Sequence, residues 1–265
     1  SVNFTSASSP TMNGKMPHIQ CTAEEIGEIV LLPGDPGRVA MFEDLLGDYK
    51  IVSNYREYVV EPDITTDQSY SVLDWNRWSV NGDRCAPADR SRRESSDPHR
   101  RDRRAERRWY RAGTMVLNSG AVRKGGDSCF YAPSEYPALA SFEVLDCLKR
   151  ACEERKNEYS MGICMSVRFL LSRTRDVRCR LRQDMMKMLF WNSMKKWNIL
   201  NMEMEAETIF TLASLNNVLS GKYLCSTLQP DHGQWLVDFE PAQKEMCRTA
   251  LAAGEKLYKE YLHRK

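Results

Sequence analysis

The stretch GEIVLLPGDPGRVAMFEDLL, residues 27–46, constrains the fold more than any other part of the chain. It predicts a buried strand over Ile29–Leu32, a turn rich in glycine and proline, and a helix from about Arg38. A second short apolar strand is predicted from Gly113, and amphipathic helices are predicted within 136–157, 201–217 and 240–263. Strands that alternate with helices favour an α/β fold with a largely parallel sheet.

Composition bounds the class of protein. A chain of 265 residues, 42% of them hydrophobic, can bury a sizeable core. The formal net charge of +2, from 38 basic and 36 acidic residues, is unlike that of a generally basic nucleic-acid-binding protein. Nine cysteines without a C-x-x-C pair indicate buried thiols of a reduced protein rather than disulfides or structural zinc.

The chain is expected to form one domain over residues 17–265 behind a mobile tail, residues 1–16, that is rich in Ser, Thr and Asn. It has no run of eighteen apolar residues and no signal-peptide pattern, so we expect a cytoplasmic protein.

The turn LLPGDPGR, residues 31–38, has the composition of an anion-binding loop. Glycine lets the backbone N–H groups approach a ligand closely, and Arg38 adds a guanidinium at the start of a helix. Taken alone, the same residues also suit an ordinary strand-to-helix turn. The motif gains weight only from the rest of the chain.

Several further motifs follow this turn in a characteristic order. They are MPHIQ from residue 16, NYREY from 54, GTMVLNSGAVRKGG from 113, YAPSEYPALASFEV from 131, GICMS from 162, and SMKKWNILNMEMEAETIFTLAS from 193. Together with VLLPGDPGR they span most of residues 17–222, and in this order they resemble the nucleoside phosphorylase family, most closely the uridine phosphorylases. The pairing of PGDPGR with NMEME at this separation is more specific than either motif alone.

The resemblance implies a three-layer α/β/α fold with a central twisted mixed sheet, and a homodimer or larger homo-oligomer. It implies reversible phosphorolysis of a nucleoside, most closely uridine, to the base and ribose 1-phosphate, a reaction of pyrimidine salvage. Phosphate is then a co-substrate, with no cofactor and no metal. Because the sugar gains positive character as the base leaves, such an enzyme needs a positioned anionic nucleophile and a clamp on the ribose.

Where residues match the family's motifs, the resemblance also implies a phosphate site. Gly34, Asp35 and Arg38 would form the phosphate loop, and Arg56 would reach the phosphate in a neighbouring subunit's site. His18 would contact the nucleoside 5′-hydroxyl across the same interface. As isolated residues, His18 and Arg56 would more often be ordinary polar surface residues.

The motif NMEMEAE implies the ribose pocket. Glu203, Met204 and Glu205 would line it, with Glu205 hydrogen-bonded to the ribose hydroxyls, although a methionine such as Met204 is more often a core residue. Two glutamates at positions i and i+2 diverge on a helix. We therefore expect a strand end or turn that leads into the helix, so that the two carboxylates converge.

One part of the family pattern is missing. Residues 62–112 match the family nowhere, and where it carries two glycine-rich strand ends the chain has eleven arginines and no glycine between Arg84 and Arg111. Read one nucleotide later, the codons of Trp75 and Trp78 each force a glycine. In that frame DPHRRDRR, residues 97–104, permits IRIGATGG, which resembles the family's phosphate-binding strand.

Two further tracts show the same behaviour. SVRFLLSRTR, residues 166–175, permits ASDSFYPGQE, which resembles the base-recognition segment, and QPD, residues 229–231, permits NRT, found near the base-covering flap. We interpret residues of roughly 62–112, 166–190 and 225–236 as written with compensating frameshifts. The family site positions that carry non-matching residues as printed are Pro98, Asp102, Thr174 and Pro230.

The alternatives come from two classes. FYPGQ favours uracil, but the shifted codon of Asp176 cannot give the family's arginine, so a purine nucleoside phosphorylase or a related nucleosidase stays open. The other alternative is an inactive homologue whose arginine tract, 84–111, is a solvated loop or binds nucleic acid. If the printed residues are literal, we expect a disordered or misplaced 62–112 and no phosphorolysis, because a buried strand cannot hold so many unpaired charges.

Overall fold

The computed structural model describes residues 10–17, 19–34, 37–46, 53–55, 58–62, 70–73, 111–167, 196–226, 228–229 and 234–263. By its internal contacts the chain divides into two compact units. The first comprises Ser1–Ala86 and Gln243–Lys265, and the second comprises Pro87–Ala242. The expected single domain over 17–265 stays a prediction.

The first unit is built around a four-stranded mixed sheet. Its strands are β1 (Ile29–Leu31), β2 (Ser53–Tyr55), β3 (Tyr58–Pro62) and β4 (Tyr70–Leu73), in the order β1-β4-β3-β2. The pairing of β1 with β4 is parallel, and the other two pairings are antiparallel. A 3-10 turn, η1 (Ala23–Glu25), precedes β1.

Two helices belong to this unit. Helix α1 (Gly37–Leu46) buries Val39, Phe42 and Leu46, which are spaced for one helix face. The second helix comes from the C-terminal end of the chain and is α5 (Glu240–Leu257), most of which belongs to this unit. It continues into a π-helical segment, η4 (Tyr258–Leu262). The predicted strand and helix of residues 29–46 are thus confirmed, with the strand one residue shorter than predicted. Residues 35 and 36 of the predicted turn lie outside the described residues.

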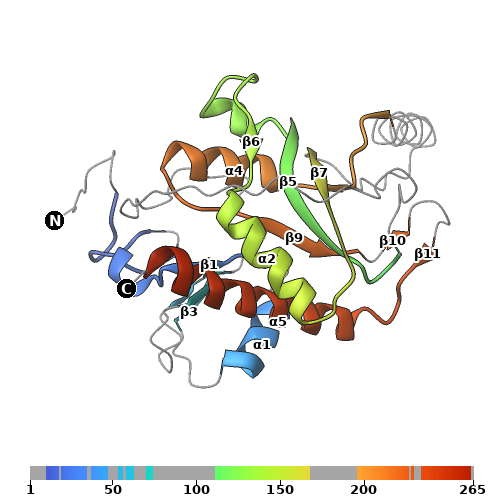
Figure 1. The fold of residues 1–265 in the computed structure, drawn as a ribbon. Helices are drawn as coiled ribbons and strands as arrows, with labels where there is room; N and C mark the ends of the chain where they lie inside the picture. Colours follow the sequence, from blue (N-terminus) through green and yellow to red (C-terminus); the bar gives the residue numbers. More distant parts are fainter. Residues whose placement is uncertain are drawn as a thin grey trace, which may run out of the picture. The chain divides into compact units, whose positions relative to one another are not determined.

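The second unit contains a five-stranded mixed sheet (Figure 1). Its strands are β5 (Met115–Lys124), β6 (Ala138–Leu139), β7 (Tyr159–Val167), β8 (Asn201–Glu203) and β9 (Lys222–Cys225). Strands β5, β7 and β8 run parallel, while β9 pairs with the first half of β5 and β6 with its second half, both antiparallel. A short antiparallel pair, β10 (Leu228–Gln229) and β11 (Gln234–Trp235), lies outside this sheet.

Helices α2 (Phe142–Glu154) and α4 (Ala206–Leu215) pack on this sheet, and a 3-10 turn, η3 (Asp127–Phe130), follows β5. Phe210 and Ala206 of α4 pack on Cys164 of β7 and Ala138 of β6 in one buried cluster. The next residue of β7, Met165, points to the opposite face and packs with Ile199. The sheet therefore has apolar contacts on both faces, as expected for largely parallel strands.

Two of the predicted helices begin later than expected. Residues 136–141 precede α2 and include β6, because Ala138 and Leu139 pair with β5. Residues 201–203 pair with β7 as β8, so α4 begins only at Ala206. In both cases the sheet provides backbone partners that outweigh a helical apolar pattern.

Candidate functional site

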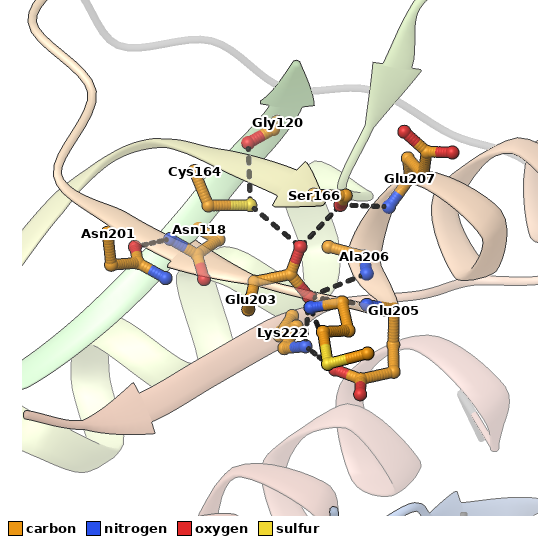
Figure 2. Close-up of polar contacts among 11 residues, drawn as sticks. Asn118, Gly120, Cys164, Ser166, Asn201, Glu203, Glu205, Ala206, Glu207 and Lys222 are labelled. Atoms are coloured by element: carbon orange, nitrogen blue, oxygen red, sulfur yellow. Dashed lines mark hydrogen bonds and ion pairs between the residues drawn. The ribbon is translucent and has the colours of Figure 1, made fainter. Parts of the chain in front are cut away.

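The candidate site lies where two parallel strands end and a helix begins. Glu203 is the last residue of β8, Met204 is 40% exposed, and Glu205 is the N-cap residue of α4. Ligands of α/β proteins bind preferentially at the carboxyl ends of parallel strands. The prediction that Glu203 and Glu205 lie in a strand end and turn, and so converge, is confirmed (Figure 2).

Glu203 is the centre of this arrangement, with a side chain that is only 7% exposed. Its Oε2 accepts hydrogen bonds from the backbone N–H groups of Glu205 (2.9 Å) and Ala206 (2.7 Å), at the positive end of α4. Its Oε1 accepts from the Ser166 hydroxyl and more weakly from Cys164 Sγ at 3.8 Å. The carboxylate therefore ties the ends of β7 and β8 to the start of α4.

A cation joins the two glutamates. The Lys222 ammonium, on β9, pairs with Glu203 Oε2 and lies 2.7 Å from Glu205 Oε2. The Lys222 side chain is 17% exposed and that of Glu205 is 26% exposed. The cluster thus runs from a buried carboxylate to one that solvent or a ligand can reach.

The surroundings shift the pKa values of Glu203, Lys222 and Cys164. Burial raises the pKa of Glu203, but the charge of Lys222 and the hydrogen bonds it accepts outweigh burial and leave its pKa below the ordinary 4.5. Burial lowers the pKa of Lys222, yet Glu203 and Glu205 together hold it above the ordinary 10.5. Both groups are therefore charged at neutral pH. The Cys164 thiol has a raised pKa, through burial and then through the charge of Glu203, and stays neutral.

A second buried carboxylate supports the start of α4. Glu207, 1% exposed, accepts hydrogen bonds from the N–H groups of Gly125 and Gly126, both at 2.9 Å, and from the Ser128 hydroxyl. Its own N–H donates to Ser166 Oγ at 2.9 Å. Ser166 thus donates to Glu203 and accepts from the Glu207 N–H, and in this way connects Glu203 to α4 (Figure 2).

Ser166 also bears on the frameshift interpretation. It is fully buried, and the shifted frame would place alanine there, which could neither donate to Glu203 nor accept from Glu207. Val167 is 6% exposed and packs with Met165 and Ile199. Ser166 and Val167, as printed, are therefore both buried and have partners in the fold. The interpretation that residues of roughly 166–190 are written in a shifted frame stays a prediction.

The described residues of the predicted phosphate loop lie in the first unit. Gly34 follows β1, and Arg38 is the second residue of α1. Arg38 Nε is buried and has no hydrogen-bond partner among the residues that the structure describes. A buried guanidinium N–H without an acceptor is costly, so an anion at this position would satisfy it.

The other predicted site residues lie outside the described residues. They are His18, Asp35, Arg56, Pro98, Asp102, Thr174 and Pro230. Within the described ranges, no group of three or more His, Cys, Asp or Glu side chains could hold a metal ion. The seven cysteines described there form no disulfide, and none of the helices in those ranges is long and apolar enough to cross a membrane.

Sequence reasoning missed three residues of the cluster: Ser166, Glu207 and Lys222. Glu207 belongs to the motif NMEMEAE and carried a signal, since an acidic residue in the first turn of a helix favours N-terminal partners. Lys222 carried none, because its role depends on β9 pairing with β5 beside β7 and β8.

The chain is similar in sequence to curated nucleoside phosphorylases. It is 29% identical over 219 residues to a guanosine phosphorylase of Halorubrum lacusprofundi (78% of this chain, 80% of the relative). Over 223 residues it is 29% identical to a uridine phosphorylase of Thermococcus kodakarensis (82% and 79%), and over 221 residues 28% identical to that of Treponema pallidum (78% and 80%). No protein-family model matches the chain.

Solved structures agree in fold. A uridine phosphorylase from Vibrio fischeri matches with a TM-score of 0.68 and 22% identity, over 93% of this chain and 98% of that one. A purine nucleoside phosphorylase from Toxoplasma gondii, in complex with immucillin-H, matches with a TM-score of 0.69 and 16% identity, over 95% and 99%. The expected α/β fold class and the resemblance to nucleoside phosphorylases are confirmed.

Proposed function

We propose that the chain, as a homologue of nucleoside phosphorylases, is itself a nucleoside phosphorylase, a pentosyltransferase that converts uridine and phosphate reversibly to uracil and ribose 1-phosphate. The observation that carries the proposal is the similarity to curated uridine and guanosine phosphorylases over 78% to 82% of the chain. The Glu203–Glu205 cluster at the carboxyl end of β8 supports it, because a ribose clamp needs charged acceptors held in place.

The parts of the site have distinct proposed roles. Glu205 accepts from the ribose hydroxyls, Glu203 and Met204 shape the ribose pocket, and Arg38 with Gly34 binds phosphate. The buried, unpartnered Nε of Arg38 supports the last assignment. The reaction needs no acid–base pair of carboxylates, since phosphate is already an anionic nucleophile, unlike the water used in glycoside hydrolysis.

The test is release of uracil from uridine with and without phosphate, on protein whose mass has been measured. We expect release only with phosphate. Release without phosphate would indicate a nucleosidase, and no release from any nucleoside would overturn the proposal. Glu205→Gln should lower kcat/KM for uridine by roughly tenfold or more, because it removes a charged acceptor.

A purine or guanosine phosphorylase is the second candidate. The relative from Halorubrum lacusprofundi and the fold match to the Toxoplasma gondii enzyme favour it. Guanosine and inosine in the same assay decide between the two bases. Phosphorolysis of either purine nucleoside in preference to uridine would replace uridine as the substrate.

We also propose a cytoplasmic homodimer or larger homo-oligomer. The proposed roles of His18 and Arg56 at a neighbouring subunit's site require one, and buried cysteines that form no disulfide in the described ranges suit a reducing compartment. Light scattering on the purified protein tests the assembly. A particle of 30.6 kDa would be a monomer and would contradict it.

A further inference from the structure

We propose that Lys222 is a positioning residue for nucleoside recognition, which holds one oxygen of the Glu205 carboxylate and leaves the other for the ribose hydroxyls. The inference rests on the proposed function, in which Glu205 binds ribose. It adds a residue from a different strand, β9, to a site otherwise formed by β8 and the start of α4.

The two oxygens of Glu205 have different surroundings. Oε2 lies 2.7 Å from the Lys222 ammonium and also accepts from the Met204 N–H at 3.4 Å. Oε1 has no hydrogen-bond partner among the residues that the structure describes. Because the side chain is 26% exposed, Oε1 is open to a ligand while Oε2 is held.

The sheet sets the position of Lys222. Lys222 pairs with Asn118 of β5 in the antiparallel ladder, so its backbone is fixed by the strand rather than by α4. Its ammonium is also held by the buried Glu203, which in turn accepts from two backbone N–H groups and Ser166. The cation is thus anchored before it meets Glu205, and the rotamer of Glu205 is selected without a ligand.

The charges of the cluster favour this role. Two carboxylates and one ammonium leave a net charge of −1, which suits acceptance of hydroxyl hydrogen bonds. Without the ammonium, two like charges would lie close together and repel, and Glu205, the more exposed of the two, would move away. Lys222 therefore acts on recognition of the ribose through Glu205.

The test measures hydroxyl selectivity, which a merely structural role would not change. The readout is kcat/KM for uridine divided by kcat/KM for 2′-deoxyuridine, at saturating phosphate, together with the KM for phosphate. In Lys222→Met the ratio should fall about tenfold while the KM for phosphate stays unchanged. The hydrogen bond from the 2′-hydroxyl to the Glu205 carboxylate weakens for uridine, and 2′-deoxyuridine has no such hydroxyl. Lys222→Arg, which keeps the charge, should restore most of the ratio.

Two further variants sharpen the result. Lys222→Gln keeps a hydrogen-bond donor for the buried Glu203. If Lys222→Met does not fold, the same kcat/KM ratio is measured in Lys222→Gln, and the same fall is expected. In a Glu205→Gln background Lys222→Met should change the ratio no further, because the acceptor it positions is gone. Lys149→Met is the matched control, because it removes a partly exposed ion pair with Glu153 (3.6 Å) on α2.

The outcomes separate the two proposals. An inactive wild type overturns the proposed function and this inference with it. An active wild type whose Lys222 variants lose activity equally on both nucleosides overturns the inference alone and leaves Lys222 a structural residue. An unchanged ratio in Lys222→Met has the same meaning.

Discussion

Glu203 shows how a carboxylate can be buried without losing its charge. Its side chain is 7% exposed, and burial alone would favour the neutral acid. Lys222, Ser166 and the N–H groups at the start of α4 supply donors that reverse this preference. The cost of burial is therefore offset only while every donor is in place.

The depressed pKa of Glu203 predicts a loss of stability in acid. Its stabilisation is fully present above the unfolded-state pKa, near the ordinary 4.5, and is lost as the pH falls through the lower folded-state value. The free energy of unfolding, measured with urea from about pH 3 to pH 7, should therefore depend less on pH in Glu203→Gln than in the wild type. Asp238→Asn, which removes an exposed carboxylate, serves as control, and curves of equal slope for all three proteins would contradict the prediction.

Ser166 allows the printed residue to be compared with the residue of the shifted reading at one buried position. Ser166→Ala introduces the residue that the shifted reading ASDSFYPGQE would place there. It should lower the free energy of unfolding by about 1–3 kcal/mol, because it removes the Ser166 donor to Glu203 Oε1 and leaves the Glu207 N–H without its acceptor. Ser214→Ala removes an exposed hydrogen bond with Tyr136 (2.7 Å) and should cost less than about 0.5 kcal/mol. If urea unfolding shows the same loss of free energy for both variants, the hydrogen bonds of Ser166 to Glu203 and Glu207 do not stabilise the fold.

At the scale of elements, the end of β5 and the start of α4 depend on each other. The N–H groups of Gly125 and Gly126 each donate to a different oxygen of Glu207, so this turn binds one carboxylate through two backbone hydrogen bonds. A Cβ on Gly125 would lie 2.8 Å from Glu207 Oε1. Gly126 has φ of +94°, which other residues rarely adopt.

This geometry predicts that Gly125→Ala destabilises the second unit. The substitution should cost about 1–3 kcal/mol, because either Glu207 or the turn must shift and two hydrogen bonds to the buried Glu207 weaken. Gly34→Ala is the control for stability, since a Cβ there meets nothing within 4 Å. Thermal unfolding followed by circular dichroism compares the two, and a melting temperature that is unchanged in Gly125→Ala would contradict the close packing of this turn.

At the scale of the whole molecule, the residues proposed to bind phosphate and those proposed to bind ribose belong to different compact units. Arg38 and Gly34 belong to the first unit, and the ribose cluster of Glu203 and Glu205 belongs to the second. The proposed phosphorolysis requires both phosphate and a nucleoside. The phosphate-binding strand that the frameshift interpretation assigns to residues 97–104 stays a prediction, and these residues lie outside the described part of the chain.

The frameshift interpretation makes a prediction for the whole chain. If the active protein carries the shifted reading, its intact mass should differ from 30.6 kDa, and the tryptic peptide WSVNGDR, residues 78–84, should be absent. Mass spectrometry of the intact protein and its peptides measures both. Peptides that read as printed would exclude an error in the determined sequence, and such a protein, with eleven arginines over 84–111, should show no phosphorolysis.

Local patterns determined a large part of this structure. The apolar run at the start of LLPGDPGR predicted β1, and the glycine and proline turn predicted the start of α1. The spacing of apolar residues predicted α2 and α5. These signals are short-range, since a strand, a turn and an amphipathic helix are each specified by neighbours in the chain. The resemblance carried by PGDPGR and NMEME likewise pointed to Glu203 and Glu205 as candidate site residues, and their role stays a prediction.

Only the tertiary structure decided what surrounds those two glutamates. Strand β8 ends at Glu203 because residues 201–203 pair with β7, and Lys222 reaches both carboxylates because β9 pairs with β5. Ser166 lies 37 residues from Glu203 along the chain, and Lys222 lies 19 residues from it. A buried charge needs partners from several elements, and which strands become neighbours is set by long-range pairing that no local sequence pattern encodes.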